Sequence, residues 1–288
     1  MIPAQFEYQA PTSVDAAIRA LASLGDRGKV VAGGHSLIPM MKLRLSQPEV
    51  LVDIGRIGEL RYIRADGDRL ALGALATHSE VIGSGAVKEM APVLAETASE
   101  IGDQQVRNRG TIGGSLAHAD PAADYPATIL ALDAEIVAQG PSGRRTIKAS
   151  DFFTGMLETA LAPDELIVEV RVPVQGRGSG GAYLKLPNKA SHYAVVGVAA
   201  VVRVDGGKLA SLAVGITGAS ARPLRATSVE RALTGQSPTA DAIAQAAQSA
   251  AEGLDLLADI HGSADYRAHI TRVYTRRAIE EAVRRAGG

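Results

Sequence analysis

Residues 30–37 read Val-Val-Ala-Gly-Gly-His-Ser-Leu. An apolar pair that runs straight into two glycines and a hydroxyl residue is typical of a strand that ends in a tight turn. Glycine has no Cβ, so such a turn permits positive φ and lets a ligand approach bare backbone. Successive N–H groups in a turn of this kind converge on an anion. The stretch therefore has the features that a diphosphate requires.

A second stretch has the same character, since residues 109–115 read Arg-Gly-Thr-Ile-Gly-Gly-Ser. Taken alone, each Gly-Gly pair is most simply a tight turn. Neither stretch matches the Gly-Lys-Ser/Thr ending of a phosphate loop or the dinucleotide fingerprint. Together, two glycine turns flanked by hydroxyl residues can hold one diphosphate from two sides. This pair is the basis of the functional prediction.

Both stretches resemble the FAD-diphosphate motifs of one protein family. The family is that of the flavoprotein subunits of molybdenum hydroxylases. Its two motifs are matched by residues 32–36 and by residues 111–114, together with the preceding Gln-Val-Arg-Asn-Arg-Gly at 105–110. Among these, the medium subunits of aerobic carbon monoxide dehydrogenases are nearest. The likeness continues through Met-Met-Lys-Leu-Arg at 40–44 and Ala-His-Ala-Asp-Pro at 117–121, and it covers essentially the whole chain.

The resemblance implies where FAD binds. The diphosphate would lie against the two glycine stretches, at Val30, Val31, Ala32, Gly33, Gly34, His35, Ser36, Leu37, Thr111, Ile112, Gly113, Gly114 and Ser115. Five further positions would contact the flavin part, namely Ile101, Asp124, Ile167, Lys185 and Tyr193. The family places Asp124 near the flavin or ribityl hydroxyls, and Tyr193 against the isoalloxazine ring with Lys185 beside it. By residue type alone, Tyr193 is equally a half-buried core aromatic, and Ile101 and Ile167 are ordinary core residues.

Other polar residues near these stretches have simpler explanations. His35 is either a side chain that bonds its own loop or a general base, and no carboxylate partner is evident. Ser36 caps a helix, donates to a phosphate, or does both. Arg107 and Arg109 are surface charges, or they attract the diphosphate.

One spacing is conceivable for a metal site. His118, Asp120 and Asp124 form His-x-Asp-x-x-x-Asp, but an Asp-Pro turn before a helix explains this spacing more simply. We recognise no Ser-His-Asp triad, no paired carboxylates and no metal-ligand cluster. The prediction therefore assigns no catalytic residue and no metal ligand to this chain.

The composition excludes several classes of function. The chain has 288 residues, a formal net charge of −1, and neither Cys nor Trp. A near-neutral chain with few aromatics does not favour nucleic-acid binding. Without Cys it holds no disulfide, thiolate nucleophile or iron–sulfur cluster, which fits a reducing cytoplasm. Its start lacks the pattern of a signal peptide, and no stretch approaches the ~18 apolar residues of a membrane span.

The order of elements predicts an α+β protein in three parts. Residues 1–55 and 56–176 read as two α/β units, and residues 177–288 read as a sheet followed by helices. The resemblance implies a two-part FAD-binding domain of the vanillyl-alcohol oxidase (PCMH) type plus a C-terminal domain. Residues 176–181 spell the dinucleotide fingerprint, but Pro187 disfavours the helix that should follow, so we interpret them as a linker or hairpin loop.

Apolar spacing and capping residues place the individual elements. We expect strands at 6–8, 29–32, 50–54, 60–63, 69–72, 134–138, 145–148, 165–172, 194–203 and 209–216. We expect helices at 14–24, 39–45, after Thr77, and at 87–101, 126–132, 224–233, 239–251 and 265–286.

The predicted function is that of an FAD-carrying electron-transfer subunit of a molybdenum hydroxylase, nearest to carbon monoxide dehydrogenase. The resemblance implies an iron–sulfur small subunit whose 2Fe–2S clusters feed the FAD, a molybdenum large subunit, a dimer of heterotrimers, and a quinone or other acceptor. It also implies a cytoplasmic complex, associated at most loosely with the inner face of the membrane through its partners. Hydroxylases acting on N-heterocycles or aldehydes, a stand-alone FAD enzyme, and a non-catalytic assembly protein remain as alternatives.

Overall fold

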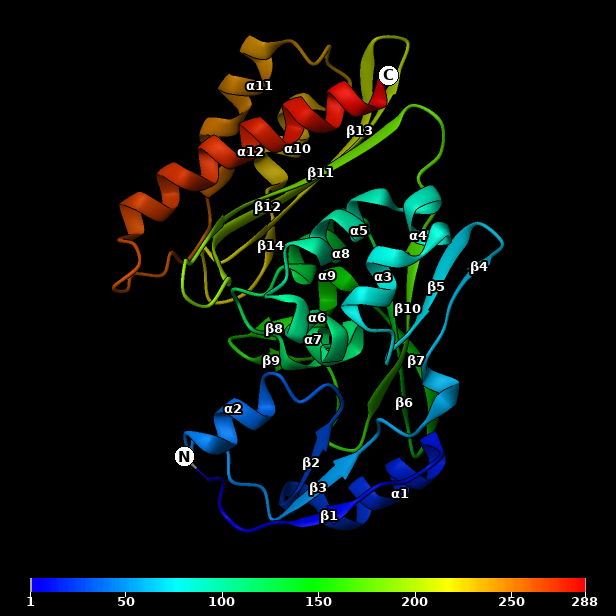
Figure 1. Ribbon diagram of the computed structural model, residues 1–288. Coiled ribbons are helices and arrows are strands. Elements are labelled where there is room, and N and C mark those ends of the chain that lie inside the picture. The colour runs from blue at the N-terminus through cyan, green and yellow to red at the C-terminus, as the bar shows by residue number, and fades with distance from the viewer. Residues whose placement is uncertain (1, 288) are drawn as a thin grey trace.

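Three parallel strands form the first sheet of the computed structural model, which describes residues 2–287 (Figure 1). Their order is β1 (Glu7–Gln9), β3 (Val50–Asp53) and β2 (Gly28–Val31). Helix α1 (Val14–Leu24) packs its apolar face against this sheet, and α2 (Leu37–Lys42) follows β2. Ser13 caps α1 by accepting from the Ala16 N–H, and Gly25 ends it at φ 55°. These elements agree with the prediction for the N-terminal unit.

The second sheet has five antiparallel strands. Its order is β4 (Ile63–Asp66), β5 (Arg69–Gly73), β10 (Leu166–Pro173), β6 (Glu135–Gly140) and β7 (Gly143–Lys148). A bulge in β10 between Ile167 and Glu169 shifts its register against β6. A small hairpin, β8 (Phe153–Gly155) and β9 (Glu158–Thr159), lies apart from this sheet.

Seven helices accompany the second sheet within the described residues. They are α3 (His78–Gly83), α4 (Gly85–Met90), α5 (Pro92–Ser99), α6 (Gln104–Arg109), α7 (Ile112–His118), α8 (Tyr125–Ala131) and α9 (Ala149–Phe152). The single helix predicted over 87–101 was wrong. Pro92 has no N–H to continue a helix from α4, so it occupies the first turn of a new one, α5.

The third sheet is antiparallel and belongs to the last part of the chain. Its order is β11 (Ser179–Pro187), β12 (Ala194–Asp205), β13 (Lys208–Thr217) and β14 (Leu224–Arg225). The helices after it are α10 (Thr227–Leu233), α11 (Ala240–Ala246) and α12 (Ala264–Ala286). Short 3-10 turns occur at Gly25–Arg27, Gly58–Leu60 and Ala247–Ala251. The mixture of parallel and antiparallel sheets with helices confirms the α+β class.

The linker predicted over 176–181 extends too far. Gly180 and Gly181 lie inside β11. A Cβ at Gly180 would stand 2.1 Å from the Ala282 carbonyl oxygen of α12. The missing side chain lets the strand touch α12, so this glycine serves close packing instead of flexibility.

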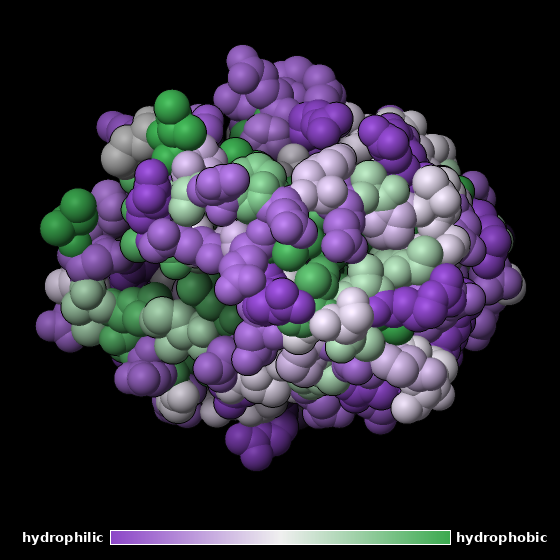
Figure 2. All heavy atoms as spheres, turned by 90° about the horizontal axis from the view of Figure 1, so that it is seen from below, coloured by the Kyte–Doolittle hydropathy of each residue, from purple (hydrophilic) through white to green (hydrophobic). Residues whose placement is uncertain are grey.

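The third sheet lies between two helical layers (Figure 1). Helix α12 covers one face, and α8 of the middle part packs on β12 and β13. Arg285 near the end of α12 forms a two-point ion pair with Glu96 of α5 and donates to the Gly181 carbonyl. Figure 2 shows the N-terminal underside of the molecule as mostly hydrophilic, with hydrophobic side chains gathered in a hollow to one side. Within residues 2–287, no helix has the length and apolar character needed to cross a bilayer.

Candidate functional site

The loop after β2 presents a row of free backbone donors. Gly34 adopts φ 75°, a left-handed conformation that glycine reaches without strain. Among residues 2–287, the backbone N–H groups of Gly33, Gly34, His35 and Ser36 donate no hydrogen bond. Consecutive unbonded N–H groups around a left-handed residue form an anion-binding concavity. The loop therefore fits the diphosphate predicted for it.

Gly33 is required by close approach and not by its φ. A Cβ at Gly33 would lie 2.2 Å from the Arg109 carbonyl oxygen and 2.8 Å from the Gly110 Cα. The backbones of the two predicted binding stretches are therefore in contact. Figure 1 shows the same arrangement, with the loop between β2 and α2 facing α6 and α7.

The second glycine stretch is not a turn, and this prediction was wrong. Thr111 is the N-cap of α7, and Gly113 and Gly114 lie in the first turn of that helix. The Thr111 hydroxyl accepts the Gly114 N–H at 3.1 Å, and the Ile112 and Gly113 N–H groups donate to Ala76 and Ala74. Because a cap residue stands directly before the apolar Ile112, the sequence did carry a helix signal, which the glycines obscured.

The two glycines of α7 differ in what surrounds them, and only Gly113 is required by close packing. A Cβ at Gly113 would lie 2.6 Å from the Ala74 Cβ, and a Cβ at Gly114 would lie 3.9 Å from the Ala32 Cβ. The start of α7 therefore lies beside the first loop. Since its N–H groups are already bonded inside the protein, the groups that α7 offers to a ligand are the Thr111 and Ser115 hydroxyls.

The other residues of the first stretch divide into core and surface. Val31 and Leu37 pack in one small apolar cluster, and Val30 and Ala32 pack against a second. His35 is exposed at the rim of the loop. Only the backbone of this stretch and the side chains of His35 and Ser36 are thus presented outward.

Tyr193 approaches this loop from the third part of the chain. Burial and the nearby Asp120 carboxylate raise the pKa of its hydroxyl, and the Ser36 side chain opposes that rise. The side chain is 37% exposed. Tyr193 follows His192, which holds φ 63°, in a turn closed by the bond from the His192 N–H to the Asn188 carbonyl. The structure therefore brings Tyr193 and Ser36 together.

Lys185 and Asp124 form a buried ion pair. The Lys185 Nζ lies 2.9 Å from the Asp124 Oδ1, and the two side chains are 1% and 5% exposed. Tyr183 donates to the same Asp124 oxygen at 2.6 Å. Burial raises the pKa of Asp124 to about 6, and the Lys185 charge and the Tyr183 hydroxyl oppose that rise. Lys185 also donates to the His192 carbonyl at 2.8 Å, so the pair supports the turn that carries Tyr193.

Ile101 and Ile167 lie in or against the large core of the middle part. Ile167 is buried at the bulge of β10, while Ile101 is half-buried just beyond α5. Both therefore have the packing roles that their residue types suggest, and their flavin contacts stay a prediction.

The comparisons with known proteins agree with this geometry. Residues 4–175 match the FAD-binding domain in molybdopterin dehydrogenase, and residues 181–282 match the CO dehydrogenase flavoprotein C-terminal domain. The chain belongs to the FAD-binding family of molybdopterin dehydrogenases.

Relatives with assigned functions span the whole chain. The carbon monoxide dehydrogenase medium chain of Hydrogenophaga pseudoflava is 43% identical over 98% of both chains. The 6-hydroxypseudooxynicotine dehydrogenase complex subunit alpha of Paenarthrobacter nicotinovorans is 40% identical over 99% of this chain and 97% of its own. A solved carbon monoxide dehydrogenase from Hydrogenophaga pseudoflava matches with a TM-score of 0.97 and 44% identity, over 99% of both chains.

Arg107 does not face the diphosphate site. Its guanidinium donates to the carbonyls of Ile101 and Gly102 at 3.1 and 3.0 Å, so it stabilises the backbone between α5 and α6. Arg109 is exposed, and its carbonyl is the atom that meets Gly33. Of the two arginines considered from sequence, Arg109 is the one whose guanidinium makes no hydrogen bond or ion pair within residues 2–287.

The acidic residues near His118 have structural partners. The Asp120 carboxylate accepts the Ala122 N–H at 2.8 Å, which forms the turn expected of Asp-Pro, and Asp124 is bonded to Lys185. Within residues 2–287, no group of three or more His, Cys, Asp or Glu side chains is arranged to hold a metal ion.

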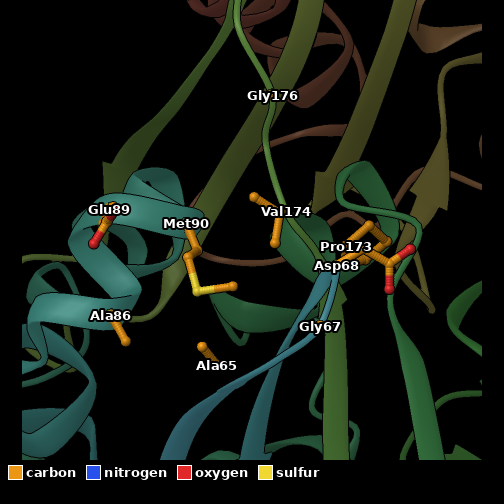
Figure 3. A pocket seen from close by; sticks show the side chains of 9 residues that line it. All are labelled: Ala65, Gly67, Asp68, Ala86, Glu89, Met90, Pro173, Val174 and Gly176. Atoms are coloured by element: carbon orange, nitrogen blue, oxygen red, sulfur yellow. The ribbon is translucent and has the colours of Figure 1, made fainter.

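An open hollow of about 660 Å³ lies away from the glycine loop (Figure 3). It lies between the β4–β5 hairpin, α4 and the segment after β10, with Met90 extending into it above Ala65. Its lining residues include none from the glycine loop at 30–37 or from α7. The hollow is therefore distinct from the proposed diphosphate site.

Proposed function

We propose that the chain is the FAD-carrying electron-transfer subunit of a molybdenum-containing hydroxylase, with carbon monoxide as the first candidate substrate of the complex. The observation that carries the proposal is the row of four unbonded N–H groups from Gly33 to Ser36, held against the segment at 109–111. A diphosphate matches this donor set, because charge-assisted bonds to several aligned N–H groups are strong. The redox chemistry belongs to the flavin, which takes up two electrons and passes them on.

The residues proposed to hold FAD are the predicted ones, with roles refined by the structure. The loop at 30–37 would bind the diphosphate through its backbone, and Thr111 and Ser115 would add hydroxyl groups from α7. Tyr193, supported by Lys185 and Asp124, would cover the flavin part, with Ile101 and Ile167 beneath it. The division of the chain at 55/56 and 176/177 likewise stays a prediction.

The chain needs partner subunits for the whole reaction. It contains no Cys, so iron–sulfur clusters lie in another chain, and the medium-chain relatives belong to enzymes of several subunits. We further propose a small iron–sulfur subunit and a large molybdenum subunit, assembled as a dimer of heterotrimers that delivers electrons to a quinone at the inner face of the membrane. A related hydroxylase acting on an N-heterocycle or an aldehyde is the second candidate, because 6-hydroxypseudooxynicotine and glyceraldehyde dehydrogenase subunits are 40% and 34% identical.

The first prediction concerns the cofactor and the partners. A tagged chain purified from its own cells should be yellow, release FAD and neither FMN nor NAD on denaturation, and carry two further subunits with it. Mass spectrometry identifies the released cofactor, and metal analysis of the complex measures iron and molybdenum.

The outcomes separate the alternatives. FMN, or no flavin at all, would contradict the cofactor proposal and leave an assembly protein. FAD on a chain that never carries iron or molybdenum partners would indicate a stand-alone flavoenzyme. The substrate class is then identified by comparing the activity of the purified complex toward carbon monoxide with its activity toward aldehydes and N-heterocycles.

A second prediction concerns Tyr193. Tyr193→Ala should keep most of its FAD but change the flavin absorbance envelope and the rate of reoxidation by oxygen. The N–H row should dominate affinity, whereas an aromatic contact contributes about 0.5–1.5 kcal/mol beyond burial. Tyr193→Phe is the matched control, because it keeps the ring and removes only the hydroxyl near Ser36. A wild-type spectrum in Tyr193→Ala would make Tyr193 a packing residue, and complete FAD loss would mean that it supplies the affinity.

A further inference from the structure

The segment 74–78 supports the second binding stretch along its whole length. The Ala74 and Ala76 carbonyls accept the N–H groups of Gly113 and Ile112, at 2.9 and 3.0 Å. The His78 N–H donates to the Gly110 carbonyl at 3.0 Å. Helix α3 starts at His78 behind a capping box made by Thr77 and Glu80, so the start of this helix is firmly fixed.

The His78 side chain reaches the same glycine. A Cβ at Gly110 would lie 2.5 Å from the His78 Nε2 and 2.8 Å from its Cδ2, so the imidazole rests directly against the glycine Cα. Gly110 itself has φ −60° and ψ 142°, which any residue adopts. Glycine is therefore required there by the imidazole and its surroundings, and not by the backbone conformation.

Gly110 in turn touches the diphosphate loop. Its Cα would lie 2.8 Å from a Cβ at Gly33, beside the contact between Gly33 and the Arg109 carbonyl. Gly110 is therefore in close contact both with the His78 imidazole and with the backbone of Gly33. A displacement of Gly110 would be felt directly at the first loop.

His78 is held as a neutral ring. The side chain is 4% exposed, its Nδ1 is buried without a hydrogen-bond partner, and the Tyr125 ring lies 5.3 Å away with its own hydroxyl unbonded. Burial lowers the pKa of His78 to about 4, and the charges of His35 and Arg107 act in the same direction. An uncharged, rigid and tightly enclosed ring is suited to act as a spacer.

We propose that His78 is a positioning residue for the diphosphate site, whose imidazole fixes the spacing of the Gly33 loop and the Gly110–Thr111 segment. The inference rests on the proposed FAD-binding function and adds a residue that does not touch the ligand. It predicts that the effects of substituting His78 and Gly110 on FAD affinity are not additive.

The test is a double-mutant cycle in the full-length chain, with FAD titrated into each variant and followed by flavin fluorescence. Gly110→Ala should weaken FAD binding by at least about tenfold, because its methyl group meets the imidazole although its backbone dihedrals accept alanine. His78→Ala should also weaken binding. Removing the ring clears both contacts shorter than 3.0 Å and leaves the methyl group 3.1 Å from the Val106 carbonyl oxygen. Gly110→Ala should therefore cost little more in the His78→Ala background.

Two further variants separate positioning from general packing. Gly83→Ala is the matched control in α3, because a Cβ there meets nothing within 4 Å, and it should bind FAD like wild type. His78→Gln places a neutral amide where the Nε2 lies and should restore most of the affinity that His78→Ala loses. Circular dichroism and thermal unfolding of each variant show whether the fold persists.

Additive effects of His78→Ala and Gly110→Ala would overturn the inference, and so would a folded His78→Gln as weak as His78→Ala. If His78→Ala does not fold, the inference is tested by the other two variants. Full FAD affinity in Gly110→Ala would overturn it, and so would a folded His78→Gln that binds FAD as weakly as Gly110→Ala. Failure of the wild-type chain to bind FAD would instead refute the proposed function, so the two failures are distinguishable.

Discussion

Gly33→Val should leave the chain folded but without FAD. The first atom of the new side chain would lie 2.2 Å from the Arg109 carbonyl oxygen, so the loop must move away from the segment at 109–111. That movement separates the two halves of the proposed diphosphate site and disturbs the row of unbonded N–H groups. Loss of several phosphate contacts should lower FAD affinity by at least roughly a hundredfold, which is about 3 kcal/mol.

The measurement is the ratio of flavin to protein absorbance in the purified chain, beside its circular dichroism. Gly85→Val is the matched control, because a Cβ at Gly85 meets nothing within 4 Å, and it should retain full FAD occupancy. Gly114→Val should act in the same direction as Gly33→Val, since its Cβ crowds the Thr111 hydroxyl at 2.8 Å. Full occupancy in both variants would make these glycines ordinary packing positions.

The first glycine loop could be predicted from sequence because its signals are local. The apolar pair of β2, the glycines and Ser36 lie within one short stretch, and the loop that they form has the donors that the pattern indicates. The second stretch shows the limit of the same reasoning. Its glycines were taken as turn residues, but Gly113 is small because α7 packs against Ala74, which is distant in sequence.

Contacts between distant segments account for the rest of the site. Nothing in the local pattern indicates that Lys185 pairs with Asp124, or that His78 rests on Gly110, since each depends on how separate elements pack. Lys185 and Asp124 were assigned to the site through the family resemblance alone. The structure adds the reason that they act together: both charges are buried, so each is stabilised by the other in place of water.

Lys185→Met should destabilise the chain by about 3–5 kcal/mol at neutral pH, the usual cost of leaving one partner of a buried ion pair uncompensated. The ammonium group donates to the Asp124 carboxylate and to the carbonyls of Glu100 and His192, so it uses all three of its protons. Methionine fills a similar volume but satisfies none of these acceptors. The turn that carries Tyr193 also loses a support.

The pH dependence of this loss has a definite sign. Burial already raises the pKa of Asp124 to about 6 in the folded chain, against a value of 3.8 for the free side chain, and without the Lys185 charge it rises further. Between the unfolded and folded pKa values the folded variant holds more protons than the unfolded one, so its stability falls as pH rises through that range. Wild type loses stability in the same way up to about pH 6, where its own Asp124 ionises. The stability difference between the two chains should therefore widen above about pH 6 and be largest at neutral pH.

Urea unfolding across that pH range measures the free energy of unfolding. The chains to compare are wild type, Lys185→Met, and the double variant Asp124→Asn with Lys185→Met. The double variant should be more stable than Lys185→Met at neutral pH and should lack its pH dependence, because no buried carboxylate remains to ionise. Arg27→Met is the control for losing a basic residue, since Arg27 and Glu49 are exposed at 3.9 Å and such a pair contributes about 0–1 kcal/mol. A Lys185→Met chain as stable as Arg27→Met at neutral pH would show that the buried pair does not support this part of the site.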